Sequence, residues 1–140
     1  MSINEAQDEI IEEFEAFDDW LDRYQLLVEY GKELQKNPMP QTDKVDTNLI
    51  DGCQSKVWIT CRKEEDGKLV FQGDSDALLV QGIVALILQV VSGHTPQEIL
   101  DTQYYFIERI GLQEHLSPTR SNGVVAMMKQ IRLYAMAYNA

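Results

Sequence analysis

The sequence is poor in cysteine and in basic residues, and both shortages limit what it can do. Its 140 residues include only two cysteines. Two are too few for a disulfide framework, so we expect one domain stabilised by an apolar core. The 12 basic residues are outnumbered by 23 acidic ones, which gives a net charge of −11. Nucleic acids and anionic membranes attract basic surfaces, so this balance argues against both as partners.

Membrane-crossing and secretory patterns are missing as well. The most apolar stretch, residues 77–91, is fifteen residues long, too short to span a bilayer. Residues 1–5 show neither the basic region nor the apolar run that opens a secretory signal peptide. We therefore expect a cytoplasmic protein, in a compartment where thiols stay reduced.

The spacings of common metal and nucleotide sites do not occur either. Cys53 and Cys61 are eight residues apart, and the histidines, His94 and His115, form no pair with each other or with a cysteine at zinc-site spacing. No glycine-rich phosphate-binding motif is found. We expect no metal site and no bound cofactor. Paired carboxylates for acid–base catalysis stay open, because no pair stands out among so many acidic residues.

The first forty residues are strongly acidic and helical in pattern. They hold 11 acidic and 3 basic residues, which we interpret as a solvated helix face rather than a docking surface. Apolar residues three and four apart predict helices over 4–20 and 22–34, ended by prolines at 38 and 40. The residues expected to face inward are Ile10, Ile11, Phe14, Phe17 and Leu21 in the first helix, and Leu26, Leu27, Tyr30 and Leu34 in the second.

A small antiparallel sheet is predicted next. Residues 56–62 and 68–72 have strand patterns and are joined by an Asp-Gly turn at 66–67, a strong hairpin signal. Residues 47–50 are a candidate third strand. The sheet would therefore have two to three strands.

Helices are predicted for the rest of the chain. The apolar stretch 77–91 indicates a helix buried on most sides, with Ser75 as its N-cap. Thr95-Pro96-Gln97-Glu98 is a capping box that opens a short helix, and another is expected over 104–110, before Gly111. A long helix over 117–138 would bury a stripe of Val124, Met127, Met128, Ile131 and Ala135. The expected fold is a single α+β domain over residues 1–140.

Cys53 is the most informative residue. It follows Asp51-Gly52, which marks a tight turn, and precedes the strand 56–62. A thiol on a turn between polar neighbours is better placed to react than to pack, whereas Cys61 suits core filler. Reaction needs a thiolate, which a nearby cation favours. Arg120, in the first turn of the last helix, could supply that charge.

Two alternatives remain open from these residues alone. Arg120 could instead form a salt bridge with Asp74 or Asp76, and we weigh the two roles equally. Cys53 could also act as the nucleophile of a hydrolase if His94 or His115 approached it in the fold.

Four segments, taken together and in order, resemble the SufE family of sulfur acceptors in bacterial iron–sulfur cluster assembly. They cover roughly residues 20–137, and the paralogous CsdE-type acceptors share the same pattern, so the subtype stays open. The segments are Gly52-Cys53-Gln54-Ser55-Lys56-Val57-Trp58, then Gln72-Gly73-Asp74-Ser75-Asp76-Ala77 with Val80-Gln81-Gly82, then Thr95-Pro96-Gln97-Glu98-Ile99, and finally Leu116-Ser117-Pro118-Thr119-Arg120-Ser121-Asn122-Gly123 with Ala126-Met127.

The resemblance implies a sulfur shuttle rather than a free-standing enzyme. A pyridoxal-phosphate cysteine desulfurase of the SufS type would hold sulfur as a persulfide, and Cys53 would accept that sulfur and stimulate the desulfurase. The sulfur would then pass to an iron–sulfur scaffold of the SufB type. Pyridoxal phosphate would belong to the partner. An apolar wall near Cys53 is expected, because a persulfide exposed to water is lost to small thiols.

The resemblance also implies roles for other residues. Arg120 matches a family arginine implicated in partner contact or in positioning the cysteine loop. Asp76 matches a position linked to the contacts of that loop at rest. Gly52 and Gln54 would shape the turn. Cys61 departs from the family pattern, which has an apolar residue there. We expect it to be core filler, with a resolving disulfide to Cys53 as the alternative. A structural interaction module remains a further alternative for the whole chain.

Overall fold

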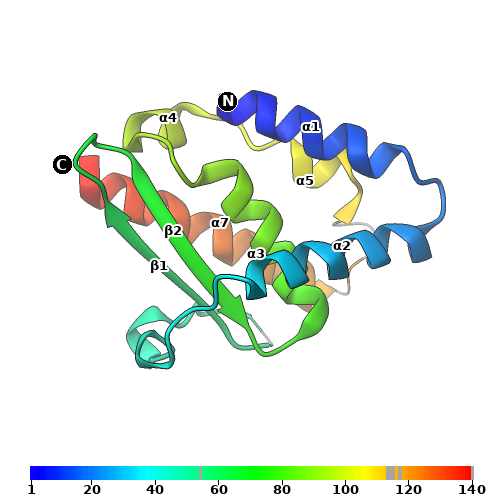
Figure 1. Ribbon diagram of the computed structural model, residues 1–140, viewed down its shortest axis with the longest axis horizontal. Coiled ribbons are helices and arrows are strands. Elements are labelled where there is room, and N and C mark those ends of the chain that lie inside the picture. The colour runs from blue at the N-terminus through cyan, green and yellow to red at the C-terminus, as the bar shows by residue number, and fades with distance from the viewer. Residues whose placement is uncertain (54, 113–115, 117, 140) are drawn as a thin grey trace.

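A buried helix, α3 (Leu78–Val91), runs through the middle of the fold in the computed structural model (Figure 1). The structure describes residues 1–53, 55–112, 116 and 118–139, and the side chains of residues 118–120 are outside the description. The other elements are α1 (Ile3–Glu15), α2 (Trp20–Gln35), η1 (Gln41–Asp43), η2 (Asp46–Asn48), β1 (Val57–Lys63), β2 (Leu69–Ser75), α4 (Pro96–Asp101), α5 (Phe106–Arg109) and α7 (Pro118–Asn139).

The arrangement confirms the α+β fold predicted from the sequence. Figure 1 shows the β1–β2 hairpin on one side of α3, with α1 and α2 on the other side and α7 behind it in this view. α3 has no polar side along its middle, since every residue from Gly82 to Leu88 is buried. Burying one leucine or isoleucine side chain contributes roughly 1.5–3 kcal/mol, so the elements around α3 gather to cover it.

α2 and α3 approach each other most closely at Gly82. A Cβ atom built on Gly82 would lie 2.1 Å from the Leu27 carbonyl oxygen, and Gly31 of α2 faces the same contact. The two backbones can therefore touch only because neither of these positions carries a side chain. This contact explains a glycine in the interior of a helix that is otherwise strongly apolar.

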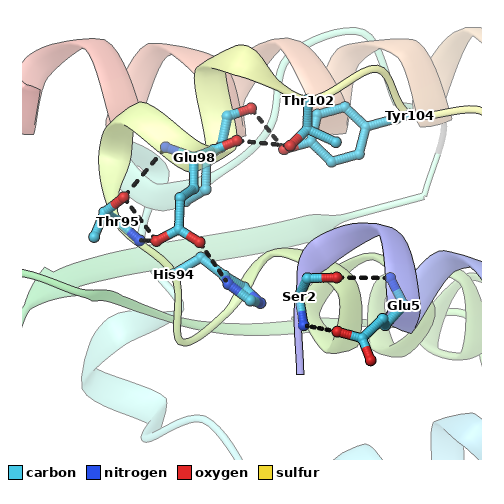
Figure 2. Close-up of polar contacts among 8 residues, drawn as sticks. Ser2, Glu5, His94, Thr95, Glu98, Thr102 and Tyr104 are labelled. Carbon is cyan, nitrogen blue, oxygen red and sulfur yellow. Dashed lines mark hydrogen bonds and ion pairs between the residues drawn. The ribbon is translucent and has the colours of Figure 1, made fainter.

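The first helix is shorter than predicted. Ser2 caps α1 in a capping box with Glu5 (Figure 2), and the helix ends at Glu15 rather than at residue 20. Asp19 then caps α2, accepting a hydrogen bond from the Leu21 N–H at 2.9 Å. The break changes the helical phase, so the prediction that Phe17 and Leu21 face inward is wrong. Their exposed fractions are 38% and 74%.

Other predicted core residues of these two helices are buried to differing extents. Ile10, Ile11, Phe14 and Leu27 lie in the core, whereas Leu26, Tyr30 and Leu34 are half-buried against it.

The sheet among the described residues has two strands, β1 and β2, which pair antiparallel from Val57 opposite Ser75 to Lys63 opposite Leu69. The candidate third strand over 47–50 is wrong. The side-chain amide of Asn48 donates to the Asp43 carbonyl at 2.8 Å, and such local bonds favour a turn over a strand. Residues 46–48 accordingly form η2, and Leu49 makes only an isolated bridge with Trp58.

Two of the predicted helix starts have different outcomes. Ser75 is not the N-cap of α3, because β2 continues through it; Ala77 occupies the cap position, and its N–H donates to Ser75 Oγ at 3.2 Å. The capping box at α4 is confirmed: Thr95 and Glu98 bond reciprocally, as Figure 2 shows. α5 spans fewer residues than the predicted 104–110, and Gly111 follows with a φ of 79°.

The last helix, α7, is bonded to the backbone of β1. The hydroxyls of Tyr134 and Tyr138 donate to the carbonyls of Ile59 and Cys61, at 2.8 and 3.2 Å. The predicted core stripe of α7 is confirmed for Val124, Met127, Ile131 and Ala135, while Met128 is half-buried. The contacts fix α7 along β1, and its first turns thereby reach the cysteine turn that precedes this strand.

None of the helices within the described part of the chain combines the length and apolar character needed to cross a membrane.

We predict that Gly82→Ala destabilises the protein, although alanine is the better helix former by about 1 kcal/mol. The added methyl group must push α2 away from α3, and overpacking of this kind costs about 1–3 kcal/mol. Urea unfolding should show a lower midpoint. Gln89→Ala, at an exposed position of the same helix, should stay within about 0.5 kcal/mol of the parent. A Gly82→Ala protein as stable as the parent would contradict the close approach.

Candidate functional site

The cysteine turn, residues 51–53, packs against the first half of α7. Gly52 has a φ of +90°, a conformation that glycine adopts without strain, and this turns the chain toward the helix. A Cβ built on Gly52 would lie 3.6 Å from the Cβ of Ala126. The predicted tight turn is therefore present, and its outer wall is a helix that begins some sixty residues later in the sequence.

The Cys53 thiol rests half-buried against this helix. Its Sγ atom lies 3.7 Å from the Gly123 carbonyl oxygen, within hydrogen-bonding reach for sulfur. Burial raises the pKa of the Cys53 thiol. The sequence predicted a thiol better placed to react than to pack. In this structure the thiol is half-buried, and its raised pKa favours the protonated form. The described neighbours of the thiol are Gly123 of α7 and the apolar core, against which Cys53 packs. The role of these contacts as the apolar wall expected for a persulfide stays a prediction.

The cysteine loop is clamped at its base from two sides. The Ile50 N–H donates to the Val57 carbonyl at 2.8 Å. Asp76 Oδ1 accepts the Lys56 N–H at 3.0 Å, and the Asp76 N–H donates to the Lys56 carbonyl at 3.2 Å. Asp76 therefore contacts the loop, as the family resemblance suggested, and its functional role stays a prediction.

A buried ion pair holds the segment before the loop onto the hairpin. Asp74 is 3% exposed and accepts hydrogen bonds from Lys44 at 2.8 Å, Gln35 at 2.9 Å and the Ser75 N–H at 2.7 Å. The Lys44 ammonium also lies 5.8 Å from the centre of the Trp58 ring. Burial tends to raise the pKa of Asp74, but these bonds outweigh it and the net pKa is below its ordinary value.

Sequence reasoning missed the Asp74 cluster. Lys44 and Gln35 carry no motif, and a lysine in a loop gives no signal of a buried partner. The cluster bears on the alternative role of Arg120, because Asp74 already has a cation, Lys44, against it. The Arg120 side chain lies outside the description, as do Gln54 and His115, so the predictions for these residues are neither confirmed nor contradicted.

His94 does not approach Cys53. It forms an isolated bridge with Leu69, which pairs with Lys63 at the end of the hairpin remote from the cysteine turn. Lys63 is six positions beyond Val57 along β1, a length of about 20 Å. Figure 2 shows His94 beside the capping box instead. Its Nδ1 lies 3.5 Å from Glu98 Oε2. The hydrolase alternative therefore lacks His94 as a base.

Cys61 lies four strand residues beyond Val57, about 13 Å farther along β1. It is half-buried against the core, and burial raises its pKa to about 11. Both cysteines are free. These observations agree with core filler rather than a disulfide partner for Cys53.

The comparison with known families decides the classification. The family model described as SufE, an Fe-S metabolism associated domain, matches residues 8–135. This chain belongs to the SufE family. The resemblance inferred from the four segments is confirmed, and the chain accordingly has a domain of iron–sulfur metabolism.

Curated relatives agree with the assignment. The chain is 44% identical to an uncharacterized SufE-like protein of Synechocystis sp., over 92% of this chain and 79% of that protein. It is 40% identical to an uncharacterized SufE-like protein of Rhizobium meliloti, over 89% of this chain and 91% of that protein. The solution structure of a hypothetical protein from Thermus thermophilus matches the fold with a TM-score of 0.76 at 22% identity, covering 95% of both chains.

We predict that Asp74→Asn lowers stability at pH 7 by about 1–3 kcal/mol, because Lys44 loses its buried partner. The folded-state pKa of Asp74 is depressed, so the ion pair stabilises above the unfolded pKa of about 3.9 and is lost as pH falls through the folded value. The difference in unfolding free energy between parent and variant should therefore stay constant from pH 7 to about pH 5 and narrow progressively from there toward pH 3. Urea unfolding across this range, with the exposed Glu65→Gln as control, tests it; a gap independent of pH would contradict the assignment.

We also predict that Asp76→Ala loosens the cysteine loop without unfolding the protein. The lost bond to the Lys56 N–H is exposed, so global stability should change by less than about 1 kcal/mol. Hydrogen exchange at Lys56 and alkylation of Cys53 should both accelerate. Asp66→Ala is a matched control, because Asp66 accepts the Lys68 N–H in the turn at the other end of the hairpin. Equal alkylation of Cys53 in the two variants would count against the clamp.

Proposed function

We propose that this chain accepts sulfur from a cysteine desulfurase onto Cys53 as a persulfide, and passes it to an iron–sulfur scaffold. The observation that carries this proposal is a single thiol on a turn that is clamped at its base and sheltered by α7 at its tip. Membership of a family of iron–sulfur metabolism supports it. The proposed donor is of the SufS type and the proposed acceptor of the SufB type.

The transfer is a thiol–persulfide exchange with no net redox change. The Cys53 thiolate attacks the terminal sulfur of the donor's persulfide, and a new bond forms between this sulfur and Cys53 Sγ. The sulfur–sulfur bond of the donor breaks, and its cysteine leaves as a thiolate that takes up the proton Cys53 gave up. Clearing the donor's persulfide frees it for another turnover, so the carrier would stimulate the desulfurase.

The resting geometry suits a carrier that reacts only with its partners. A protonated, half-buried thiol is a poor nucleophile toward small oxidants and stray metal ions. The loop must leave α7 to enter another protein's active site, while its base stays joined to the hairpin through Ile50 and Asp76. The reaction needs no general base on this chain, because the attacking species is the thiolate itself.

Further parts of the proposal concern the surroundings of Cys53. We expect Arg120 to contact the partner or to position the loop, and Gly52 and Gln54 to shape the turn. The chain itself would hold no cofactor, with pyridoxal phosphate bound to the desulfurase. A reducing cytoplasm would keep Cys53 available between transfers.

The direct test is intact mass spectrometry after incubation with a cysteine desulfurase and free cysteine. We expect one added sulfur, about 32 Da, on the peptide that contains Cys53, removable by a thiol reductant. Cys53→Ser should abolish the addition and the stimulation of the desulfurase while leaving the melting temperature nearly unchanged. Cys61→Ser is the matched control and should load as the parent does. Loading of the Cys53→Ser protein, or no loading of the parent by any desulfurase, would refute the proposal.

A further inference from the structure

Gly123 occupies an unfavourable position for its residue type. It lies in the interior of α7, where glycine is the poorest helix former after proline, and it is buried. Helix propensity alone would favour almost any other residue there. A local choice that contradicts its own secondary structure indicates a constraint from elsewhere in the fold.

The constraint is Cys53. A Cβ built on Gly123 would have three nearest neighbours, and all of them belong to this one residue: Sγ at 3.4 Å, and Cα and Cβ at 3.9 Å each. Among the described residues, the atoms nearest to such a Cβ therefore all belong to the cysteine, and a longer side chain would compete with it for this space. The missing side chain also leaves the Gly123 carbonyl open to the thiol, with Sγ at 3.7 Å.

This carbonyl can hold the thiol only in its protonated form. A carbonyl oxygen has two lone pairs, so it can accept a bond within its helix and a second from the S–H group. A thiolate has no proton to donate, and a bond to the neutral form disfavours ionisation. The contact therefore works in the same direction as burial. Among the described residues of the loop, the hairpin and α7, no charged side chain contributes to the shift of the Cys53 pKa.

We propose that Gly123 is a positioning residue that keeps the empty carrier at rest: its missing side chain leaves the space beside α7 to the Cys53 sulfur, and its carbonyl accepts a hydrogen bond from the thiol. The inference rests on the proposed function and adds a control to it. Cys53 becomes a competent nucleophile when its sulfur moves away from Gly123. A partner that draws the loop off α7 therefore also activates the thiol. A large side chain at position 123 would displace the sulfur from α7 and so reproduce part of the partner's effect on the thiol.

The test measures Cys53 directly in a Cys61→Ser protein, which has one thiol. The rate of alkylation by iodoacetamide is followed from pH 6 to pH 10 for Gly123→Leu and Gly123→Ala. Asn122→Leu is the matched control, since it adds the same side chain one residue earlier at an exposed position. For Gly123→Leu we expect the rate at pH 7 to rise about tenfold and the pH midpoint to fall toward about 8.5, the value of a free cysteine.

Gly123→Ala keeps the test decisive if the leucine variant does not fold. Its Cβ would lie 3.4 Å from Sγ, at the close edge of ordinary van der Waals contact, so we expect at most a slight displacement and a rate increase of no more than about twofold. A purely structural glycine would change the melting temperature and leave the pH midpoint of Cys53 where it is. Midpoints equal to that of the parent in both variants, or an equal shift in Asn122→Leu, would overturn the proposal.

Sulfur loading separates this inference from the function on which it rests. If a desulfurase loads the Cys61→Ser parent but Gly123→Leu alkylates as the parent does, only the role of Gly123 fails. If the parent is never loaded, the carrier function fails and the inference about its resting state fails with it.

Discussion

The fold depends on one constraint: α3 is apolar on all sides along its middle and must be covered everywhere. A helix with a polar face could lie at the surface, but this one requires α1 and α2 on one side and β2 on another. Gly82 lets α2 come into backbone contact, which brings the segment after α2 back toward the hairpin. The position of the hairpin, and therefore of the cysteine turn at its start, follows from how α3 is enclosed.

The packing around α3 also places the cysteine loop between the hairpin and α7, and the candidate site depends on this placement. The cysteine loop leads into β1 and is bonded at its base to Asp76, the residue that follows β2, whereas the Cys53 thiol lies on α7. The base contacts are hydrogen bonds of ordinary length, two between backbone groups and one from the Lys56 N–H to the Asp76 carboxylate. The tip is held by one weak sulfur–carbonyl contact and by packing against Gly123 and Ala126. Weak contacts at the tip and stronger ones at the base allow a loop to move its thiol without loss of its place on the domain.

Sequence reasoning predicted the parts of this fold that have local causes. The capping box at Thr95, the Asp-Gly turn and the apolar stretch of α3 each act within a few residues, so their patterns suffice. Sequence reasoning failed where a distant or competing contact determines the local structure. Asn48 turns its segment into η2, and the break before Asp19 resets the helical phase at Leu21. The candidate site shows the same division, because the turn at Cys53 was predictable and its seat on Gly123, seventy residues away, was not.

The proposed carrier role places two opposed requirements on the Cys53 thiol, which must be protected between transfers and reactive during them. On α7 the sulfur is sheltered, and burial together with a carbonyl acceptor keeps its proton in place. Away from α7 the same thiol would ionise like any free cysteine, with a pKa of about 8.5. A fixed cation beside a rigid cysteine could give a thiolate permanently, but it would also expose that thiolate to every oxidant. Because the contacts that protect the thiol come from a separate helix, α7, the reactivity of Cys53 depends on where its loop lies. A docking partner could change that position.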